Sequence, residues 1–315
     1  MQYKQLGTTN LMISPLAFGG NVLGWTLNEK NSFDILDAFV AGGGNFIDTA
    51  DVYARWATGV GGESETILGN WLKTRKHRHQ LVLATKVGME MGPGSSGLSK
   101  KYILKAVEAS LKRLQCDYID LYQSHKDDQK TPQEETLSAY EQLIKEGKVR
   151  HIGASNFSAE RLTQALEMAD KFGLPKYQTL QPHYHLLERK LYETELESLC
   201  TQHHLGVINY FPLASGFLTG KYRSEADMNK SVRGSSMGKF MHEKGFALLK
   251  VLDEVASAHG VAPATVTLAW YLNRPSISAP IVSATSIGQL NQILAAASLQ
   301  LNQTEIKAID QCSGY

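Results

Sequence analysis

Short apolar runs that end at a small or polar residue recur along the chain. Residues 45–48, 81–87 and 119–125 are rich in β-branched and aliphatic side chains, and they carry Asp48, Lys86 and His125 at or next to their ends. Apolar runs of this length are typical of buried β-strands. Five more runs of the same form lie at residues 16–20, 149–156, 179–182, 206–211 and 279–285. The pattern therefore predicts eight strands.

Apolar residues at helical spacing fill most intervals between these strands. From Asp48 to Lys86 is 38 positions (86 − 48), and from Lys86 to His125 is 39 (125 − 86). A strand, a crossover helix and two loops need about 30 or more residues, so this spacing predicts repeated strand–helix units. The predicted helical segments are 31–40, 100–114, 137–144, 162–172, 191–199, 246–255 and 288–297.

Eight such units predict an α/β fold, a (β/α)8 TIM barrel formed by a single domain over residues 1–315. A doubly wound sheet is the alternative, but the polar strand ends recur around all eight units and not at one switch point. Ahead of the barrel, residues 3–6 and 11–16 flank a Gly-Thr-Thr-Asn turn and predict a β-hairpin at the barrel bottom. Residues 215–245, rich in Gly, Ser and charge, predict a long loop after strand seven.

Composition narrows the class of protein. The 315 residues are 43% hydrophobic, enough for a large core, and 32 basic against 31 acidic side chains give a net charge of +1. Without a basic stripe we expect no nucleic-acid binding, and no apolar run approaches the roughly 20 residues of a membrane span. The first residues do not form a signal peptide, and Cys116, Cys200 and Cys312 are widely separated. We therefore expect reduced thiols in a cytoplasmic enzyme.

The polar strand ends predict one polar site. The C-terminal ends of barrel strands share one rim, so Asp48, Lys86 and His125 should lie together, with Tyr53 close behind Asp48. A single buried charge at a strand end can occur without a function, but ionisable residues at three successive strand ends indicate a functional site. A lysine inside a barrel could also form a Schiff base with a ketone, so an aldolase that uses Lys86 is an alternative.

A second group of polar residues follows the sixth strand. His183 and His185 form an H-x-H pair that could bind a metal ion. No third ligand is apparent in the sequence. We therefore expect these histidines to lie at the pocket or its rim, and we expect no metal site.

Several ordered motifs resemble those of the aldo-keto reductase family, and the resemblance covers nearly the whole chain. The segment Gly216–Tyr222 is most similar to bacterial reductases related to potassium-channel β subunits. The resemblance implies hydride transfer from NADPH to an aldehyde or ketone. The motifs are Asp48–Ala50 with Tyr53, Gly62–Glu65, Thr85-Lys86, Asp120–His125, Gly147–Phe157, and Tyr210–Ala214 with Gly220–Tyr222.

The same resemblance implies a role for each of four residues. Tyr53 would be the general acid that protonates the carbonyl oxygen. Lys86 is expected to lower the pKa of that phenol from its usual value near 10, and Asp48 to hold the lysine charged. His125 is expected to stay neutral beside Lys86 and to donate a hydrogen bond to the substrate oxygen.

The cofactor contacts are also implied by resemblance, since no G-x-G-x-x-G follows a strand. Ser155, Asn156 and Gln181 match positions that bind the nicotinamide carboxamide, and Tyr210 matches the ring that stacks on nicotinamide. The positions for the pyrophosphate are Leu213, Gly216, Leu218 and Lys221, and those for the adenine-ribose end lie between Ser283 and Gln289, with Thr285 among them.

Residues 281–293 include no charged side chain, although many relatives place a cation there for the 2′-phosphate of NADP(H). Arg233, in the long loop, matches an arginine that some relatives use instead. NADP(H) is therefore the expected cofactor, and NAD(H) stays open. Trp25 and Trp56 fall in rim loops and are expected to line the substrate pocket.

A third reading is not primarily enzymatic. The resemblance to channel β subunits would also fit a regulatory subunit that holds NADP(H), reports redox state and turns over little. The expected partner of the enzyme is a small carbonyl substrate, with no nucleic acid and no membrane, whereas the redox-sensing reading adds a partner to which the redox state is reported. Both readings are compatible with a homo-oligomer.

Overall fold

The barrel strands lie where the apolar runs predict them. The computed structural model describes residues 1–315. Its barrel strands are β3 (Ala17–Gly19), β4 (Phe46–Asp48), β5 (Val82–Val87), β6 (Ile119–Ser124), β7 (Val149–Ser155), β8 (Thr179–Gln181), β9 (Gly206–Val207) and β10 (Ile281–Val282). Neighbours pair in parallel in the order β10-β3-β4-β5-β6-β7-β8-β9. The ring closes where the N–H groups of Ser278 and Ile281 donate to the carbonyls of Val207 and Asn209 at 2.7 and 2.9 Å.

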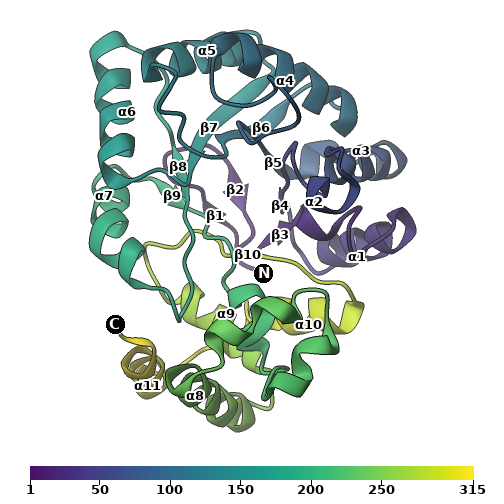
Figure 1. Ribbon diagram of the computed structural model, residues 1–315, viewed down its shortest axis with the longest axis vertical. Helices are drawn as coiled ribbons and strands as arrows, with labels where there is room; N and C mark the ends of the chain where they lie inside the picture. The colour runs from purple at the N-terminus through teal and green to yellow at the C-terminus, as the bar shows by residue number, and fades with distance from the viewer.

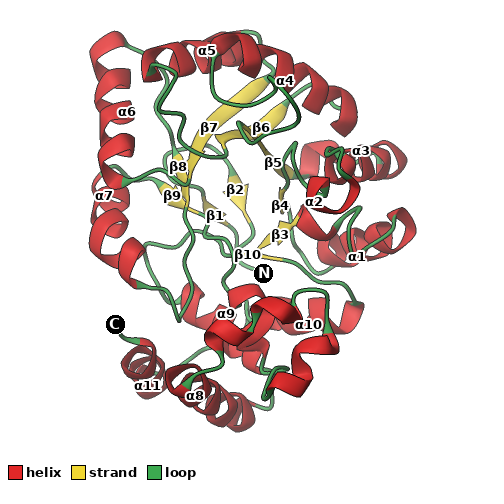
Figure 2. Ribbon diagram, viewed as in Figure 1, coloured by secondary structure: helices red, strands yellow, loops and turns green.

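Helices surround this sheet (Figures 1 and 2). They are α1 (Glu29–Ala41), α2 (Arg55–Thr58), α3 (Glu63–Arg75), α4 (Lys100–Leu114), α5 (Gln133–Lys145), α6 (Ala159–Phe172), α7 (Glu197–Gln202), α8 (Glu243–His259), α9 (Pro263–Leu272), α10 (Ile287–Ala295) and α11 (Gln303–Ser313). Helix α4 shows why the pattern works: the Ser99 hydroxyl caps its first turn, and Ile103, Val107 and Leu111 enter the core. The predicted α/β barrel is confirmed.

The structure departs from the predicted helices at several places, and α2 and α11 lie outside every predicted segment. In α9, residues 264–271 are all buried, so no amphipathic period marks this helix in the sequence. Helix α3 buries the polar Ser64 and Glu65 together with Leu68, so its buried face does not appear as an apolar stripe in the sequence. Segment 191–199 is not one α-helix, because a π-helical turn (Tyr192–Leu196) precedes α7.

The N-terminal hairpin fills the barrel bottom, as predicted. Its strands are β1 (Lys4–Gln5) and β2 (Met12–Ile13), and they pair antiparallel. Leu6, Leu11 and Ile13 pack with the inward side chains of the barrel strands. Gly7 makes this approach possible, because it has φ +54° and a Cβ there would lie 2.5 Å from the Gly206 nitrogen.

The predicted long loop after β9 forms no α-helix before α8. Short 3-10 turns occupy it, beginning with Ala214–Thr219. It is nevertheless packed, because Phe217, Tyr222, Met237 and Phe240 are buried. The loop precedes a group of helices, α8 to α11, that lies together at the lower end of Figure 1.

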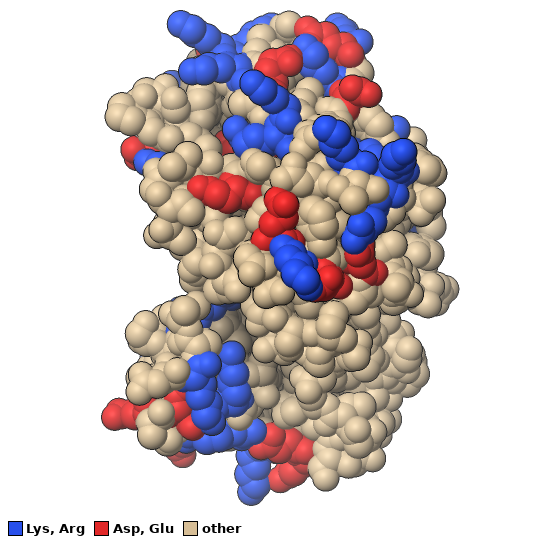
Figure 3. All heavy atoms as spheres, turned by 90° about the vertical axis from the view of Figure 1, so that its right-hand side faces the viewer, with Lys and Arg blue, Asp and Glu red and all other residues tan.

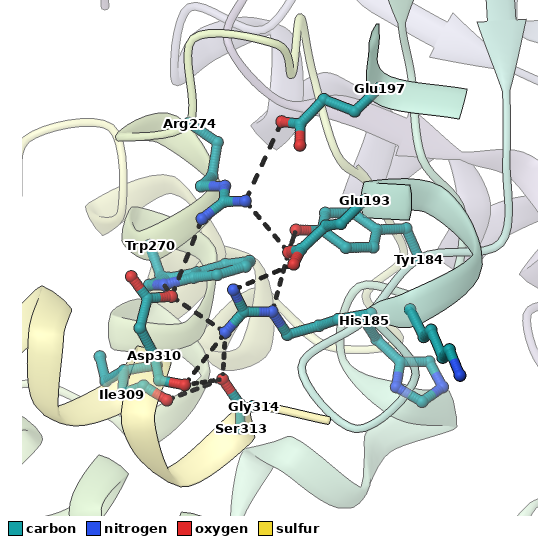
Figure 4. Close-up of polar contacts among 12 residues, drawn as sticks. Tyr184, His185, Glu193, Glu197, Trp270, Arg274, Ile309, Asp310, Ser313 and Gly314 are labelled. Atoms are coloured by element: carbon teal, nitrogen blue, oxygen red, sulfur yellow. Dashed lines mark hydrogen bonds and ion pairs between the residues drawn. The ribbon is translucent and has the colours of Figure 1, made fainter. Parts of the chain in front are cut away.

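A cluster of ion pairs ties α11 to the rest of the barrel (Figure 4). Arg189 lies 2.8 Å from Glu193 and 3.0 Å from Asp310, and Arg274 lies 3.0 Å from Glu193. Both guanidinium groups lie over the ring of Trp270, at 5.1 and 5.0 Å from its centroid. Every charge in the cluster has an opposite partner, which offsets the cost of removing it from water.

On the side of the molecule drawn in Figure 3, basic and acidic side chains occur next to one another, and neither charge covers that side alone. This matches the net charge of +1. None of the helices has both the length and the apolar character needed to cross a membrane.

Candidate active site

Asp48, Lys86 and Tyr53 meet at the C-terminal rim of the barrel. Lys86 Nζ donates to Asp48 Oδ2 at 2.6 Å, to the Thr49 carbonyl at 2.8 Å and to the Tyr53 hydroxyl at 2.9 Å. Asp48 and Lys86 are fully buried. The ammonium thus uses all three of its protons, and the carboxylate offsets the cost of burying its charge.

Two buried amides complete the environment of Asp48. Gln123 Nε2 and Gln181 Nε2 donate to Asp48 Oδ1 at 3.1 and 2.9 Å. Asp48 therefore has hydrogen bonds on both oxygens. Sequence reasoning missed Gln123, although its position two residues before His125 on a strand places both side chains on the same face of the sheet.

The pKa of Tyr53 differs from the expectation. Burial, followed by the nearby Asp48 carboxylate, raises the pKa of Tyr53 well above its usual value. Lys86 was expected to lower it, but the carboxylate that fixes the lysine also lies 3.4 Å from the tyrosine hydroxyl. Burial in turn lowers the pKa of Lys86, against the opposing effect of Asp48. The phenol is accordingly held protonated, the state that a proton donor requires.

His125 lies beside Tyr53, with ring centroids 6.0 Å apart. Burial, and then the Lys86 charge, lowers the pKa of His125 well below its usual value. The imidazole is therefore neutral at pH 7, as expected. Its Nδ1 is buried without a hydrogen-bond partner, so Nε2 is the nitrogen that can reach the pocket.

A second carboxyl group lies behind the site. Asp51 is buried, and neither of its oxygens has a hydrogen-bond partner. Burial and the neighbouring Glu65 raise the pKa of Asp51 to about 8. Glu65 itself is held by Arg113 at 2.7 Å and by the Thr85 hydroxyl at 2.6 Å. Sequence reasoning gave no role to this group.

A cavity of about 740 Å³ opens above the catalytic candidates. No acidic residue lines it, and its two charged lining residues are Lys221 and Arg233. Neither cation forms an ion pair with a carboxylate, whereas the buried Lys86 and Arg189 both do. The cavity is therefore suited to a large ligand with negative charge. The expected site residues that line it are Tyr53, His125, Ser155, Asn156, Gln181, Tyr210, Leu213, Gly216, Lys221, Arg233, Ser283, Thr285, Gln289 and Trp56.

Two expected contact residues do not line the cavity. The side chain of Leu218 is buried in the hydrophobic core. Trp25 stands behind the wall, where its ring packs edge-on against Trp56 at 5.5 Å and lies 5.1 Å below Arg233. Trp56, in turn, lies 5.9 Å from the Tyr53 ring. Trp25 thus contacts two residues that line the cavity, Trp56 and Arg233.

The residues expected at the carboxamide end form a connected hydrogen-bond chain. The Tyr210 hydroxyl donates to Asn156 Oδ1 at 2.8 Å, and Asn156 Nδ2 donates to Ser155 Oγ at 3.1 Å and to the His125 carbonyl at 2.9 Å. Both protons of the Gln181 amide nitrogen are used, because it donates to Asp48 Oδ1 at 2.9 Å and to Gln123 Oε1 at 3.2 Å. Gln181 can therefore offer a ligand only its amide oxygen.

Arg233 lies close to Asn21, in the 3-10 turn (Gly20–Val22) that follows the first barrel strand. Its Nη2 lies 2.8 Å from the Asn21 amide oxygen, and the Asn21 amide nitrogen then lies 2.7 Å from Ser283 Oγ. Ser283 also donates to the Gly19 carbonyl at 2.7 Å. Arg233 thus connects the long loop to the strand end that leads into α10.

Helix α10 begins at this edge of the cavity. Ser286 caps it, and its hydroxyl accepts the Gln289 N–H. Gln289 Oε1 accepts hydrogen bonds from the Thr285 N–H at 2.9 Å and from the Thr285 hydroxyl at 3.0 Å. The helix N-terminus therefore offers a favourable end for an anion but no cation of its own.

Several residues around the cleft hold a left-handed backbone without being glycine. Ala54, which follows Tyr53, has φ 72°, and Asn156 and Phe211 have φ 56° and 59°. Ala214 and Ser215 have φ 48° and 57° and precede Gly216 at φ 105°. Such backbone is uncommon and costs free energy, and it clusters at functional sites.

The H-x-H pair has a third potential ligand in the folded chain. Glu188 Oε2 lies 3.0 Å from His183 Nδ1 and 3.7 Å from His185 Nε2. The sequence reveals no such residue, because a turn returns Glu188 to the histidines. The expectation that these residues hold no metal thus rested on an incomplete ligand set.

Comparison with known proteins agrees with this geometry. The model of the aldo/keto reductase family matches residues 15–314. A probable voltage-gated potassium channel subunit beta of Arabidopsis thaliana is 35% identical over 311 residues, 95% of this chain and 92% of that protein. The uncharacterized oxidoreductase YrpG of Bacillus subtilis is 35% identical over 318 residues, covering 98% and 95%. The L-glyceraldehyde 3-phosphate reductase of Escherichia coli O157:H7 is 32% identical over 327 residues, covering 99% and 92%. The Asp48–Lys86 pair beneath a cavity without acidic residues agrees with this match. This chain belongs to the aldo/keto reductase family.

Proposed function

We propose that this protein reduces an aldehyde or ketone to the alcohol with NADPH, and that Tyr53 supplies the proton. The observation that carries the proposal is the contact of Lys86 with both Asp48 and the Tyr53 hydroxyl. That contact lies at the floor of a cavity whose only charges are the cations Lys221 and Arg233.

The cavity fits a dinucleotide. Lys221 Nζ would lie 3.6 Å from a Cβ built on Gly216, so the cation stands over backbone that lacks a side chain. A diphosphate can bind between the Lys221 ammonium and this backbone, and the Arg233 guanidinium can bind a further phosphate. Asn156 and the free oxygen of Gln181 can hold a carboxamide. When bound, a reduced nicotinamide supplies the hydride.

Tyr53 and its neighbours provide the proton transfer that accompanies hydride transfer. As the carbonyl carbon is reduced, negative charge develops on oxygen, and the Tyr53 hydroxyl can protonate it. The Lys86 ammonium, 2.9 Å away, then stabilises the phenolate that remains. His125, neutral and with Nε2 toward the pocket, can donate a hydrogen bond to the same oxygen and so orient the substrate.

The geometry disfavours a Schiff-base aldolase. An amine must present a free lone pair to attack a ketone. Lys86 donates all three protons of a buried ammonium to Asp48, Thr49 and Tyr53. The redox-reporting alternative uses the same cofactor site, so only turnover separates it from the reductase. The free thiols of Cys116, Cys200 and Cys312 support the proposed cytoplasmic location.

The test follows NADPH absorbance with an activated aromatic aldehyde in wild type and Tyr53→Phe, with NADPH binding measured by fluorescence. We expect the variant to bind NADPH but to lose about 10²-fold or more in turnover. Tyr3→Phe is the matched control, because Tyr3 is exposed and bonds only the Gly43 carbonyl.

Each outcome is informative. Equal turnover in Tyr53→Phe would refute the general-acid role. Tight NADPH binding without turnover by wild type would favour the redox-reporting subunit. Absence of NADPH binding would refute both.

A further inference from the structure

We propose that His183, His185 and Glu188 form a binding site for a divalent transition metal, with Zn²⁺ as the favoured ion. The site lies just beyond β8, in the segment that forms one wall of the barrel mouth. It is separate from the Asp48–Lys86–Tyr53 contact.

The backbone brings the three side chains together. His183 and His185 are two positions apart in an extended segment, so their side chains lie on the same face of it. Their rings lie 4.9 Å apart at 88°. The Glu188 N–H then donates to the His185 carbonyl at 2.8 Å, which closes a short turn and brings the carboxylate near one nitrogen of each ring. Figure 4 shows His185 beside the ion-pair cluster that includes Glu193, Arg274 and Asp310.

The ligand atoms are already near a metal-binding arrangement. One nitrogen from each histidine and one Glu188 oxygen all lie within 4.8 Å of one another. Zinc bonds of about 2.0–2.1 Å in a tetrahedron place ligand atoms about 3.3 Å apart. The observed 3.0 Å and 3.7 Å separations from Glu188 bracket that value. Small side-chain movements would therefore complete the site.

The ligand set indicates the class of ion. Two imidazoles and one carboxylate suit Zn²⁺, Co²⁺ or Ni²⁺, whereas Mg²⁺ and Ca²⁺ favour all-oxygen sites. The His183 and Glu188 side chains are 28% and 43% exposed. An ion can therefore enter from solvent, and a water can take the fourth position, as in other sites with three protein ligands.

Two neighbours oppose the ion and limit its affinity. Lys239 Nζ lies 3.6 Å from Glu188 Oε1, but its side chain is 58% exposed and can move away. The Leu187 N–H donates to His185 Nδ1 at 3.2 Å, and this acceptor is lost when Nε2 binds a metal and the proton moves to Nδ1. A buried donor left without a partner weakens binding by about tenfold or more. We expect micromolar affinity.

Occupancy should affect the cofactor pocket. The His183 ring packs on Tyr210, with centroids 5.2 Å apart at 36°, and lies 5.8 Å from the Phe211 ring. Tyr210 lines the large cavity. A metal on His183 would hold this ring in place and thereby change NADPH affinity. This coupling rests on the proposed function, whereas the metal site itself does not.

The experiment uses the full chain without an affinity tag, after removal of metals with a chelator. Zn²⁺ binding is measured by calorimetry, and Co²⁺ binding by visible absorption, which reports four-coordinate ligation. We expect one ion per chain for each and no binding of Mg²⁺. His183→Ala and Glu188→Gln should each weaken binding by about tenfold or more, and Lys239→Gln should strengthen it.

His203→Ala is the matched control, since this histidine lies at the end of α7, outside the site. Glu188→Gln keeps the shape of an exposed side chain, so its effect does not depend on folding. Binding that is unchanged in both His183→Ala and Glu188→Gln, or lost equally in His203→Ala, would overturn the site, as would no binding by wild type. A Zn²⁺ effect on NADPH affinity that persists in Glu188→Gln would overturn the coupling alone.

Discussion

Lys86 Nζ lies 2.6 Å from Asp48 Oδ2, and neither side chain is exposed to solvent. Such a pair must offset a large desolvation penalty, and here Thr49, Tyr53, Gln123 and Gln181 add hydrogen bonds to its two members. The pair therefore contributes to folding and to the proposed chemistry, and substitutions can separate these contributions.

Asp48→Asn should destabilise the protein by about 3–5 kcal/mol, because it leaves the Lys86 charge buried without a carboxylate. Urea denaturation measures the loss. Combining it with Lys86→Met removes the stranded charge, so the double variant should regain much of the stability while staying inactive. A single variant as stable as wild type would contradict a charged Lys86 in the folded protein.

Asp51→Asn should stabilise the protein increasingly as pH rises. The pKa of Asp51 is about 8 in the folded chain, against about 3.9 in an unfolded one. Between these values the folded protein retains a proton that the unfolded chain releases, so wild type loses up to about 1.4 kcal/mol of stability per pH unit. The asparagine variant lacks this loss.

Urea denaturation at intervals from about pH 5 to pH 8 measures the difference between wild type and Asp51→Asn. The exposed Asp117→Asn is the control and should show no such trend. A difference that does not change with pH would mean that Asp51 is ionised in the folded protein.

Arg233→Gln should weaken NADPH binding by about tenfold or more, since charged hydrogen bonds contribute about 1.5–3 kcal/mol. NADH, which lacks the 2′-phosphate, should be much less affected. Lys221→Gln is the companion variant and should weaken both cofactors alike, as expected for a diphosphate contact. Calorimetric titration gives the affinities, and equal losses for both cofactors in Arg233→Gln would assign that arginine to a shared part of the dinucleotide.

Arg189→Met should destabilise the protein by about 1.5–3 kcal/mol, because Glu193 and Asp310 each lose a charged hydrogen bond, although Arg274 still pairs with Glu193. Arg223→Met is the comparison. Its pair with Asp253 is about as short, at 2.7 Å, but its side chains are 43% and 42% exposed, so the expected loss is at most about 1 kcal/mol. Similar thermal shifts for the two variants would show that burial does not set the strength of these pairs.

The barrel could be predicted because each strand repeats one local signal, an apolar run with a polar end, and the spacing of Asp48, Lys86 and His125 fixes the repeat. Helix α9 could not, since a helix buried on every side has no amphipathic period. The four catalytic candidates followed from the same strand ends and from the family resemblance.

Other features of the site depend on tertiary structure. Glu188 joins His183 only through a turn, and the direction of the Tyr53 pKa depends on how deeply the hydroxyl is buried and on Asp48 beside it. The position of Trp25 behind Trp56, and not in the cavity wall, likewise depends on how two loops pack. None of these has a signature in local sequence.

The residues with left-handed backbone around the cleft link the thermal stability of this protein to its turnover. Ala54, Asn156, Phe211, Ala214 and Ser215 each hold a backbone that costs of order 1–3 kcal/mol, and the barrel core must offset their sum. A search for heat-resistant variants should therefore recover glycine at these positions early. Since glycine would also loosen the wall that shapes the pocket, such variants should lose turnover as they gain melting temperature.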